Sequence, residues 1–187
     1  MPNAQYPMPN AQCPVPSAQG PVPSAQCPTP SAQCPVPNAQ CPVPSADDRR
    51  TPVVWDAFAG SGAFGIEFLS RNWAKYAIFT DTNAGAVRTI RKNLTGIDGD
   101  AIVKTTDALS AADEFGPRAD VIFLDPPYAD HELGEKLVKK LSRIAKAGAI
   151  VVWEQEQGTG TGKRNGNFTI LKDKTYGRAR FLIMKKE

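Results

Sequence analysis

The sequence predicts an α/β protein with a doubly wound, mostly parallel sheet of the seven-stranded type, preceded by a disordered N-terminal arm. Two observations support this. From Asp47 onward, short apolar runs alternate with amphipathic helical patterns, which is the order of βαβ units. Residues 1–46 hold 13 of the 17 prolines and none of the 41 charged residues, so the composition changes abruptly near Asp47.

The first 46 residues form a Pro/Ala/Gln heptapeptide repeat, with copies such as VPSAQCP and VPNAQCP. Frequent prolines remove amide donors and hold a chain extended, and the repeat has no apolar face on which to stack. All four cysteines lie here, at spacings that fit neither a metal site nor a compact disulfide framework. We therefore expect a disordered arm over 1–46, one folded domain over 47–187, and no bound metal.

The folded part is expected to contain five strands of the parallel sheet, each a short apolar run: 52–58, 76–81, 101–107, 119–125 and 149–156. Amphipathic patterns predict three helices between them, over 62–71, 83–94 and 132–144, and Asn83 is the expected N-cap of the second. The third and fourth strands are expected to be joined by a loop through Gly116 and Pro117. Residues 167–173 and 178–186 are expected to close the sheet as an antiparallel pair around Tyr176 and Gly177.

Acidic residues end four of the predicted strands: Asp56, Asp81, Asp107 and Asp125. In a doubly wound fold, ligands bind beyond the carboxyl ends of the parallel strands. These four carboxylates are therefore expected at one edge of the sheet, where they would face a ligand. Each acid taken singly is also a plausible cap for a helix or a turn.

The stretch DAFAGSGAFG joins the first strand to the first helix, and Gly60, Gly62 and Gly65 satisfy the G-x-G-x-x-G pattern. Such a loop suits an adenosine-containing ligand, including a nicotinamide dinucleotide. Asp56 favours S-adenosylmethionine over a dinucleotide, because a carboxylate would repel a pyrophosphate but attract the ammonium and sulfonium groups of S-adenosylmethionine. Asp81 is placed to accept from ribose hydroxyls, and Asp107 to accept from the adenine amine.

The stretch Asp125-Pro126-Pro127-Tyr128 follows the fourth strand. An exocyclic amine of guanine or adenine is a poor nucleophile because its lone pair is delocalised into the ring. The Asp125 carboxylate and the Pro126 carbonyl could accept its two N–H bonds, and Tyr128 could stack on the base. The tetrapeptide therefore predicts methylation of an exocyclic amine. A plain strand terminator is the alternative interpretation.

The C-terminal segment from Lys163 to Glu187 carries eight Lys or Arg against two acids. A basic tail on a nearly neutral domain is typical of nucleic-acid binding, although a solvated hairpin has the same composition. The cations expected to contact nucleic acid are Lys163, Arg164, Lys174, Arg178 and Arg180.

Taken together, DAFAGSGAFGIEFLSR, VIFLDPPY and KTYGRARFLIM resemble the 16S ribosomal RNA guanine-N2 methyltransferases, which are class I, Rossmann-like and S-adenosylmethionine-dependent. The resemblance covers about residues 52 to 185. Where the family carries a basic hairpin and a helix before the first core strand, this sequence has the repeat. The resemblance implies that the cofactor is held by Asp56, Phe58, Gly60, Ser61, Gly62, Asp81, Asp107 and Ala108. It also implies that residues 125–128 receive a guanine of ribosomal RNA in assembled or assembling small subunits.

Three other functions are compatible with parts of the sequence. The same tetrapeptide serves DNA adenine-N6 and other amino methyltransferases, which usually carry an added target-recognition region. A nicotinamide-dependent oxidoreductase would use the glycine loop but leave residues 125–128 unexplained. An inactive methyltransferase core could act as a binding protein that presents the proline-rich arm. We find no pattern of a secretory leader and no membrane-spanning run, so a cytoplasmic protein is expected. The protein is also expected to be a monomer.

Overall fold

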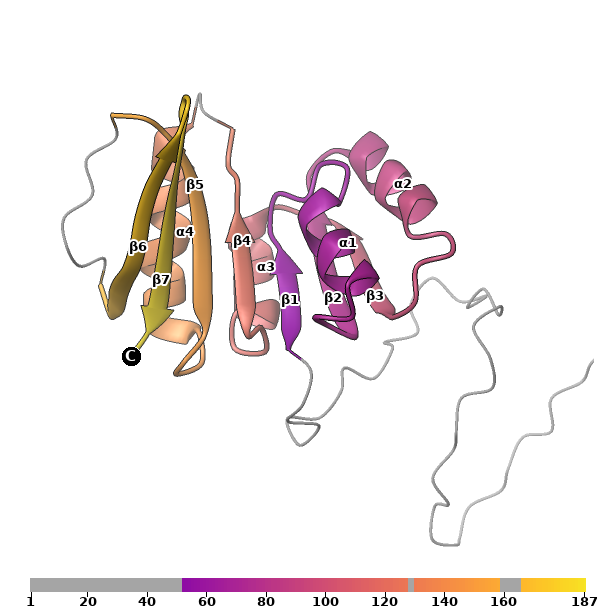
Figure 1. Cartoon of the computed structure of the whole chain (residues 1–187), viewed down its shortest axis with the longest axis horizontal. Coiled ribbons are helices and arrows are strands. Elements are labelled where there is room, and N and C mark those ends of the chain that lie inside the picture. The colour runs from indigo at the N-terminus through magenta and orange to yellow at the C-terminus, as the bar shows by residue number, and fades with distance from the viewer. Residues whose placement is uncertain (1–51, 128–129, 159–165) are drawn as a thin grey trace, which may run out of the picture. The chain divides into compact units, whose positions relative to one another are not determined.

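A computed structural model describes residues 52–127, 130–158 and 166–187. They form a sheet with the strand order β3-β2-β1-β4-β5-β7-β6 (Figure 1). Its strands are β1 (Val53–Asp56), β2 (Tyr76–Asp81), β3 (Asp100–Thr105), β4 (Val121–Leu124), β5 (Ile150–Glu156), β6 (Phe168–Tyr176) and β7 (Ala179–Lys186). The first five strands are parallel, and β7 is antiparallel to both of its neighbours, β5 and β6.

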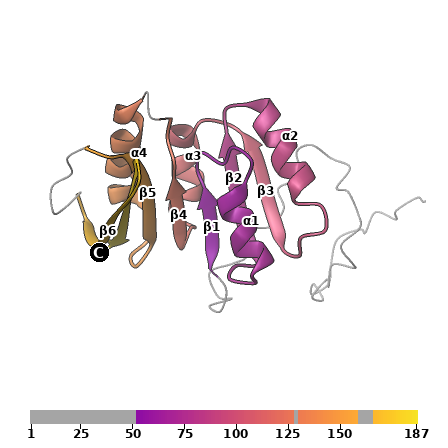
Figure 2. The same ribbon diagram turned by 45° about the horizontal axis from the view of Figure 1, so that its top comes forward.

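Helices lie on both faces of the sheet (Figures 1 and 2). They are α1 (Ala63–Ser70), α2 (Ala84–Asn93), α3 (Ala108–Phe115) and α4 (His131–Ile144). One cluster of buried residues joins α1 and α2 to one face of β2, through side chains such as Leu69, Phe79 and Ile90. A larger cluster joins α3 and α4 to the opposite face, under the central strands and β7.

This architecture confirms the predicted fold class and most of the predicted elements. The second strand has the predicted bounds, and the Asn83 side chain accepts hydrogen bonds from the Gly85 and Ala86 amides as the N-cap of α2. The predicted loop through Gly116 and Pro117 is present, but the helix that precedes it, α3, was not predicted. The buried side of α3 consists mainly of alanines, Ala108, Ala111 and Ala112, so its apolar periodicity is weak. The predicted arm over residues 1–46 lies outside the described residues.

A buried relay holds the carboxyl ends of β1 and β2 together. The Trp55 indole N–H donates to the Thr80 hydroxyl at 3.0 Å, and that hydroxyl donates to the Ala57 carbonyl at 3.0 Å. Trp55 and Thr80 are fully buried, so each bond replaces water that the polar group has lost. Because the relay ends one residue beyond β1, it fixes the start of the glycine loop relative to the second strand.

The half of the sheet formed by β4, β5 and β7 is covered unequally on its two faces. On the α4 side, Val151, Trp153 and Leu182 are fully buried. On the α1 side, Val152 and Ile183 are only half-buried, and they are register partners. Phe123 continues this row and stacks on Phe64 of α1 with ring centroids 4.0 Å apart, which identifies the face. Among the described helices, α1 therefore reaches this half of the sheet only at its β4 edge.

Among residues 52–127, 130–158 and 166–187, no helix has both the length and the apolar composition needed to cross a bilayer.

Gly134 of α4 packs directly on the Trp153 indole of β5. A Cβ atom at Gly134 would lie 2.8 to 3.0 Å from three atoms of that ring. We therefore expect Gly134→Ala to destabilise the fold by roughly 1 to 3 kcal/mol through overpacking. This loss should exceed the gain of up to about 1 kcal/mol that alanine brings to a helix interior. Urea unfolding measures the change. Glu135→Ala, at the exposed neighbouring position of the same helix, is the matched control and should change stability by less than about 0.5 kcal/mol.

Candidate active site

Three of the four predicted acids meet at the carboxyl edge of the parallel strands. Asp56 and Asp81 are the last residues of β1 and β2, and Asp125 follows the last residue of β4. Asp107 was predicted to end the third strand, but β3 ends two residues earlier, at Thr105, and Asp107 is the N-cap of α3. The edge therefore carries acids from adjacent strands, with the glycine loop between β1 and α1 beside them (Figure 1).

The glycine loop needs glycine at three positions for different reasons. Gly60 and Gly62 have φ of +52° and +81°, a region that other residues adopt only with strain. A Cβ atom at Gly65 would lie 2.4 Å from the Phe79 ring, so α1 can pack on β2 only without a side chain there. A Cβ atom at Gly60 would meet nothing within 4 Å. The loop backbone at Gly60 is therefore open to a ligand.

The Asp56 carboxyl is buried with only half of its hydrogen-bonding capacity used. Its side chain is 2% exposed, and Oδ2 accepts from the Gly65 amide at 3.2 Å. Oδ1 is buried without a partner among the described residues. Burial, with smaller contributions from Asp125 and Asp81, raises the pKa of Asp56 to about 7, against the bond from Gly65, which lowers it. A bound cation facing Oδ1 would offset the loss of water.

Asp81 ties the end of β2 to the glycine loop. Its Oδ2 accepts from the Gly60 amide at 2.8 Å, and its Oδ1 accepts from the Asn83 amide at 2.7 Å. Because each carboxylate oxygen has two lone pairs, these bonds leave acceptor capacity for a ligand. Asp81 therefore positions the loop and remains able to accept from a hydroxyl group.

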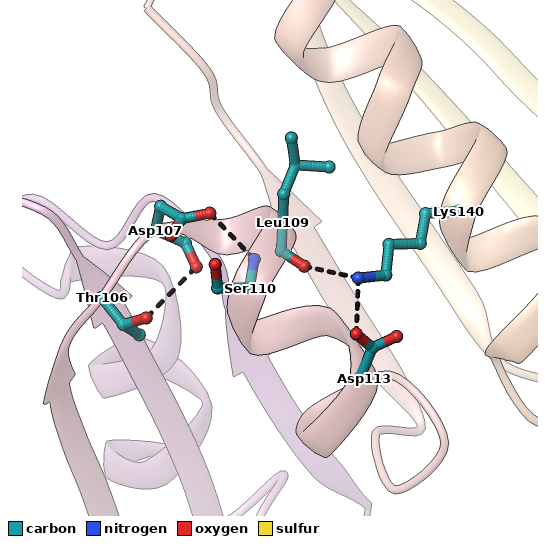
Figure 3. A network of polar contacts seen from close by, with 6 residues as sticks. All are labelled: Thr106, Asp107, Leu109, Ser110, Asp113 and Lys140. Atoms are coloured by element: carbon teal, nitrogen blue, oxygen red, sulfur yellow. Dashed lines mark hydrogen bonds and ion pairs between the residues drawn. The ribbon is translucent and has the colours of Figure 1, made fainter.

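Asp107 acts as a helix cap in the structure (Figure 3). Its Oδ1 accepts from the Ser110 amide at 2.8 Å, and hydrogen bonds from the Ser110 hydroxyl and amide lower the pKa of Asp107. Lys140 of α4 then holds α3 in place by donating to the Leu109 carbonyl at 2.8 Å and to Asp113 at 2.7 Å. Recognition of adenine by Asp107 remains a prediction. Ala108, the other residue predicted there, is buried in the core.

Phe58 and Ser61, the remaining residues of the predicted cofactor site, lie in the glycine loop. Phe58 is half-buried and packs against the larger core cluster. Ser61 is exposed, and its carbonyl accepts from the Asn93 side chain of α2 at 3.0 Å. The loop is thus anchored on both sides, and its contribution to binding would come mainly from its backbone and from Phe58.

Asp125 lies beside a second acid that the sequence analysis did not single out. β4 and β5 pair up to Leu124 and Trp153, so Asp125 and Glu154 follow in neighbouring strands. Partial burial, and then repulsion from Glu154, raise the pKa of Asp125 to about 6. Glu154 lies within β5, two residues before its end at Glu156, so a search for acids at strand ends would not have found it.

The prolines of the tetrapeptide shape the turn that follows Asp125. Pro126 is buried and Pro127 is exposed, and the Pro127 carbonyl accepts from the Asp130 amide at 2.9 Å. Asp130 in turn caps α4 by accepting from the Leu133 amide at 3.1 Å. Tyr128 lies outside the described residues, so its predicted stacking role stays a prediction.

Two of the basic residues predicted to bind nucleic acid form ion pairs with acids of β5 and β6. Arg178 pairs with Glu156 at 2.8 Å, and Arg180 pairs with Asp173 at 2.6 Å. Lys174 is exposed on β6. Lys163 and Arg164 lie outside the described residues. Within residues 52–127, 130–158 and 166–187, no group of three or more His, Cys, Asp or Glu side chains could hold a metal ion.

The chain is similar to known proteins in sequence and in fold. Residues 46–185 match the family model described as "Conserved hypothetical protein 95". The chain is 34% identical over 140 residues to "Putative rRNA methyltransferase YlbH" of Bacillus subtilis, covering 70% of this chain and 74% of the relative. It is 30% identical over 144 residues to "Ribosomal RNA small subunit methyltransferase D" of Escherichia coli, covering 73% and 72%.

A solved structure of a conserved hypothetical protein from Streptococcus pyogenes superposes with a TM-score of 0.61 at 28% identity. The superposition covers 73% of this chain and 87% of that protein. The chain therefore belongs to the Conserved hypothetical protein 95 family.

The buried carboxyl of Asp56 predicts an unusual dependence of stability on pH. Its pKa is raised from 3.8 to about 7, so the folded protein binds this proton more tightly than the unfolded chain does. The stability linked to this group is fully present below pH 4 and is lost as pH rises toward 7. The total is on the order of 4 kcal/mol. Asp56→Asn, which retains an acceptor for the Gly65 amide, should unfold at a higher urea concentration than the parent at pH 8, with the difference vanishing near pH 4.

Proposed function

We propose that this chain transfers a methyl group from S-adenosylmethionine to the exocyclic N2 amine of a guanine in 16S ribosomal RNA. The observation that carries the proposal is the placement of Asp125 and Pro126 at the same sheet edge as the buried, half-satisfied Asp56. Relatives whose names specify ribosomal RNA as substrate support RNA over DNA adenine as the target.

The residues around the glycine loop fit S-adenosylmethionine, whose sulfonium supplies an electrophilic methyl group when bound. Asp56 would face its positive charges, because Oδ1 is buried without a partner and a cation would offset the loss of water. The open space at Gly60 would admit the methionine part beside Ser61 and Gly62, with Phe58 packed beneath. Asp81 would accept from ribose hydroxyls, and Asp107 with Ala108 would border the adenine.

Asp125 and the Pro126 carbonyl would hold the guanine amine by accepting its two N–H bonds. This draws the nitrogen out of conjugation with the ring and aims its lone pair at the methyl group. The nitrogen would take up the methyl group that the bound cofactor supplies from its sulfonium, and it would afterwards release one proton to solvent. Tyr128 would stack on the base, and the rigid proline pair would keep the carbonyl in position.

Asp125→Asn tests the proposal directly. The amide retains the shape of the side chain but loses the charge and places an N–H donor where an acceptor is needed. We expect methyl transfer from labelled cofactor to undermethylated small subunits to fall about 100-fold or more in kcat, the size of effect seen when a preorganised polar group is removed. Cofactor affinity, measured by calorimetry, should change less than twofold.

Asp130→Asn is the matched control for Asp125→Asn. It makes the same chemical change five residues later, and asparagine serves equally well as the N-cap of α4. Its activity should stay within twofold of the parent. Equal activity of the Asp125 and Asp130 variants would remove Asp125 from the mechanism. A parent chain that binds no S-adenosylmethionine would refute the proposed cofactor.

The raised pKa of Asp125 predicts the pH dependence of the reaction. Only the ionised carboxylate of Asp125 accepts from the amine N–H without carrying a proton of its own, so kcat should fall as pH drops through about 6. Glu154→Gln removes the neighbouring charge that helps to raise this pKa, and the acid limb should then move to lower pH. A pH profile of single-turnover rates measures the shift. An unmoved acid limb would show that the charge of Glu154 does not influence Asp125 in the complex.

A further inference from the structure

The β6–β7 hairpin turns at the same edge of the sheet as the proposed active site. Glu156, the last residue of β5, pairs with Ala179, the first residue of β7, and Ala179 pairs with Tyr176, the last residue of β6. Gly177 makes the turn with φ of +59°. The tip of the hairpin therefore lies at the end of the sheet where β5 also ends (Figure 1).

Tyr176 and Asp125 share one face of the sheet. Side chains alternate between faces along a strand, so Asp125 lies on the face of Phe123, and Glu154 lies on the face of its register partner Phe181. Phe181 is opposite Lys174, and Tyr176 follows Lys174 by two residues on the same face. β4 and β6 are three strand spacings apart, roughly 14 Å.

The Tyr176 ring is exposed and yet held in place. It is 68% exposed, the most exposed of the large apolar side chains in the described part of the chain. Its ring contacts the half-buried Phe181 edge to face, with centroids 6.1 Å apart, which is a favourable aromatic geometry. One face of an aromatic ring is thus presented to solvent by a strand end. Unstacked nucleobases bind to aromatic platforms of this kind.

Two lysines lie beside Tyr176 on β6, and two acids share this sheet face on β5, Glu154 and Glu156. Lys172 and Lys174 share its side of β6, and no described carboxylate lies within ion-pair distance of either one. Arg178 and Arg180, by contrast, pair with Glu156 and Asp173 and so brace the hairpin. Phosphate groups of a strand that passes over Tyr176 would meet the two lysines.

Resting on the proposed function, we infer that Tyr176 stacks on an unpaired base of the RNA a few nucleotides from the methylated guanine, with Lys174 contacting the adjoining phosphate. The site takes a single-stranded nucleotide and is separate from the tetrapeptide at residues 125–128. It positions the RNA and takes no part in methyl transfer.

The test compares Tyr176→Ala with Tyr176→Phe, which keeps the ring. Leu171→Ala is the matched control, since Leu171 is also on β6 and 51% exposed but is no part of this site. The stacking energy of one base corresponds to a change of about 5-fold to 150-fold in affinity. Tyr176→Ala should therefore raise KM for undermethylated small subunits about tenfold, while kcat and cofactor affinity stay within twofold. Tyr176→Phe and Leu171→Ala should match the parent.

Two further measurements separate the possible failures. Fluorescence anisotropy with a labelled single-stranded RNA oligonucleotide tests stacking even if the parent transfers no methyl group, and Tyr176→Ala should lose affinity where Leu171→Ala does not. Unchanged KM and oligonucleotide affinity in Tyr176→Ala, with Asp125→Asn still inactive, would overturn this inference and leave the proposed function standing. A parent dimer that dissociates on Tyr176→Ala, observed by sedimentation, would assign the ring to a protein contact and also overturn it.

Discussion

Asp56 is the last residue of β1, and its carboxyl group is buried away from water. In place of water it accepts one hydrogen bond. The Gly65 amide satisfies Oδ2, and that bond holds the first turn of α1 against the end of β1. The Trp55–Thr80–Ala57 relay and the bond from Gly60 to Asp81 fix the same loop from the second strand. The glycine loop is therefore shaped around a buried group that is costly to ionise.

That cost is the physical reason to expect a cation at this site. A buried carboxyl with an unpaired oxygen is neutralised either by a proton or by a positively charged ligand, and the raised pKa of Asp56 reflects the first outcome. A cationic ligand would replace the proton near neutral pH. The ionised Asp56 carboxylate would thus strengthen the binding of a cationic ligand and lower the stability of the fold. Such a trade-off is common where a binding site is preorganised.

Elements with strong apolar patterns could be predicted from the sequence, and elements without them could not. β2 was predicted with its observed bounds, because six residues in a row read as a buried strand. α3 was missed, since its buried residues are mostly alanine and its N-cap, Asp107, was assigned to a strand end. The glycine positions were predictable because a tight turn before a helix restricts the choice of residue.

The electrostatic properties of the site depend on the register in which the strands pair, so they could not be predicted from the sequence alone. Pairing of β4 with β5 brings Glu154 beside Asp125 and raises the pKa of that carboxyl. Pairing of β6 with β7 past the irregularity at Ile170 and Lys172 sets Asp173 opposite Leu182, within reach of Arg180. From composition alone, Arg178 and Arg180 are counted as available cations, whereas in the structure Arg180 pairs with Asp173 within the hairpin and Arg178 pairs with Glu156 of β5.

The β6–β7 hairpin is assembled from neighbours in the sequence, and it joins the rest of the sheet through the pairing of β7 with β5 alone. The glycine loop is different, because it belongs to strands that are separated by helices. Under the proposed function, substitutions at the hairpin tip would therefore change contacts to the RNA and leave the shape of that loop unaltered.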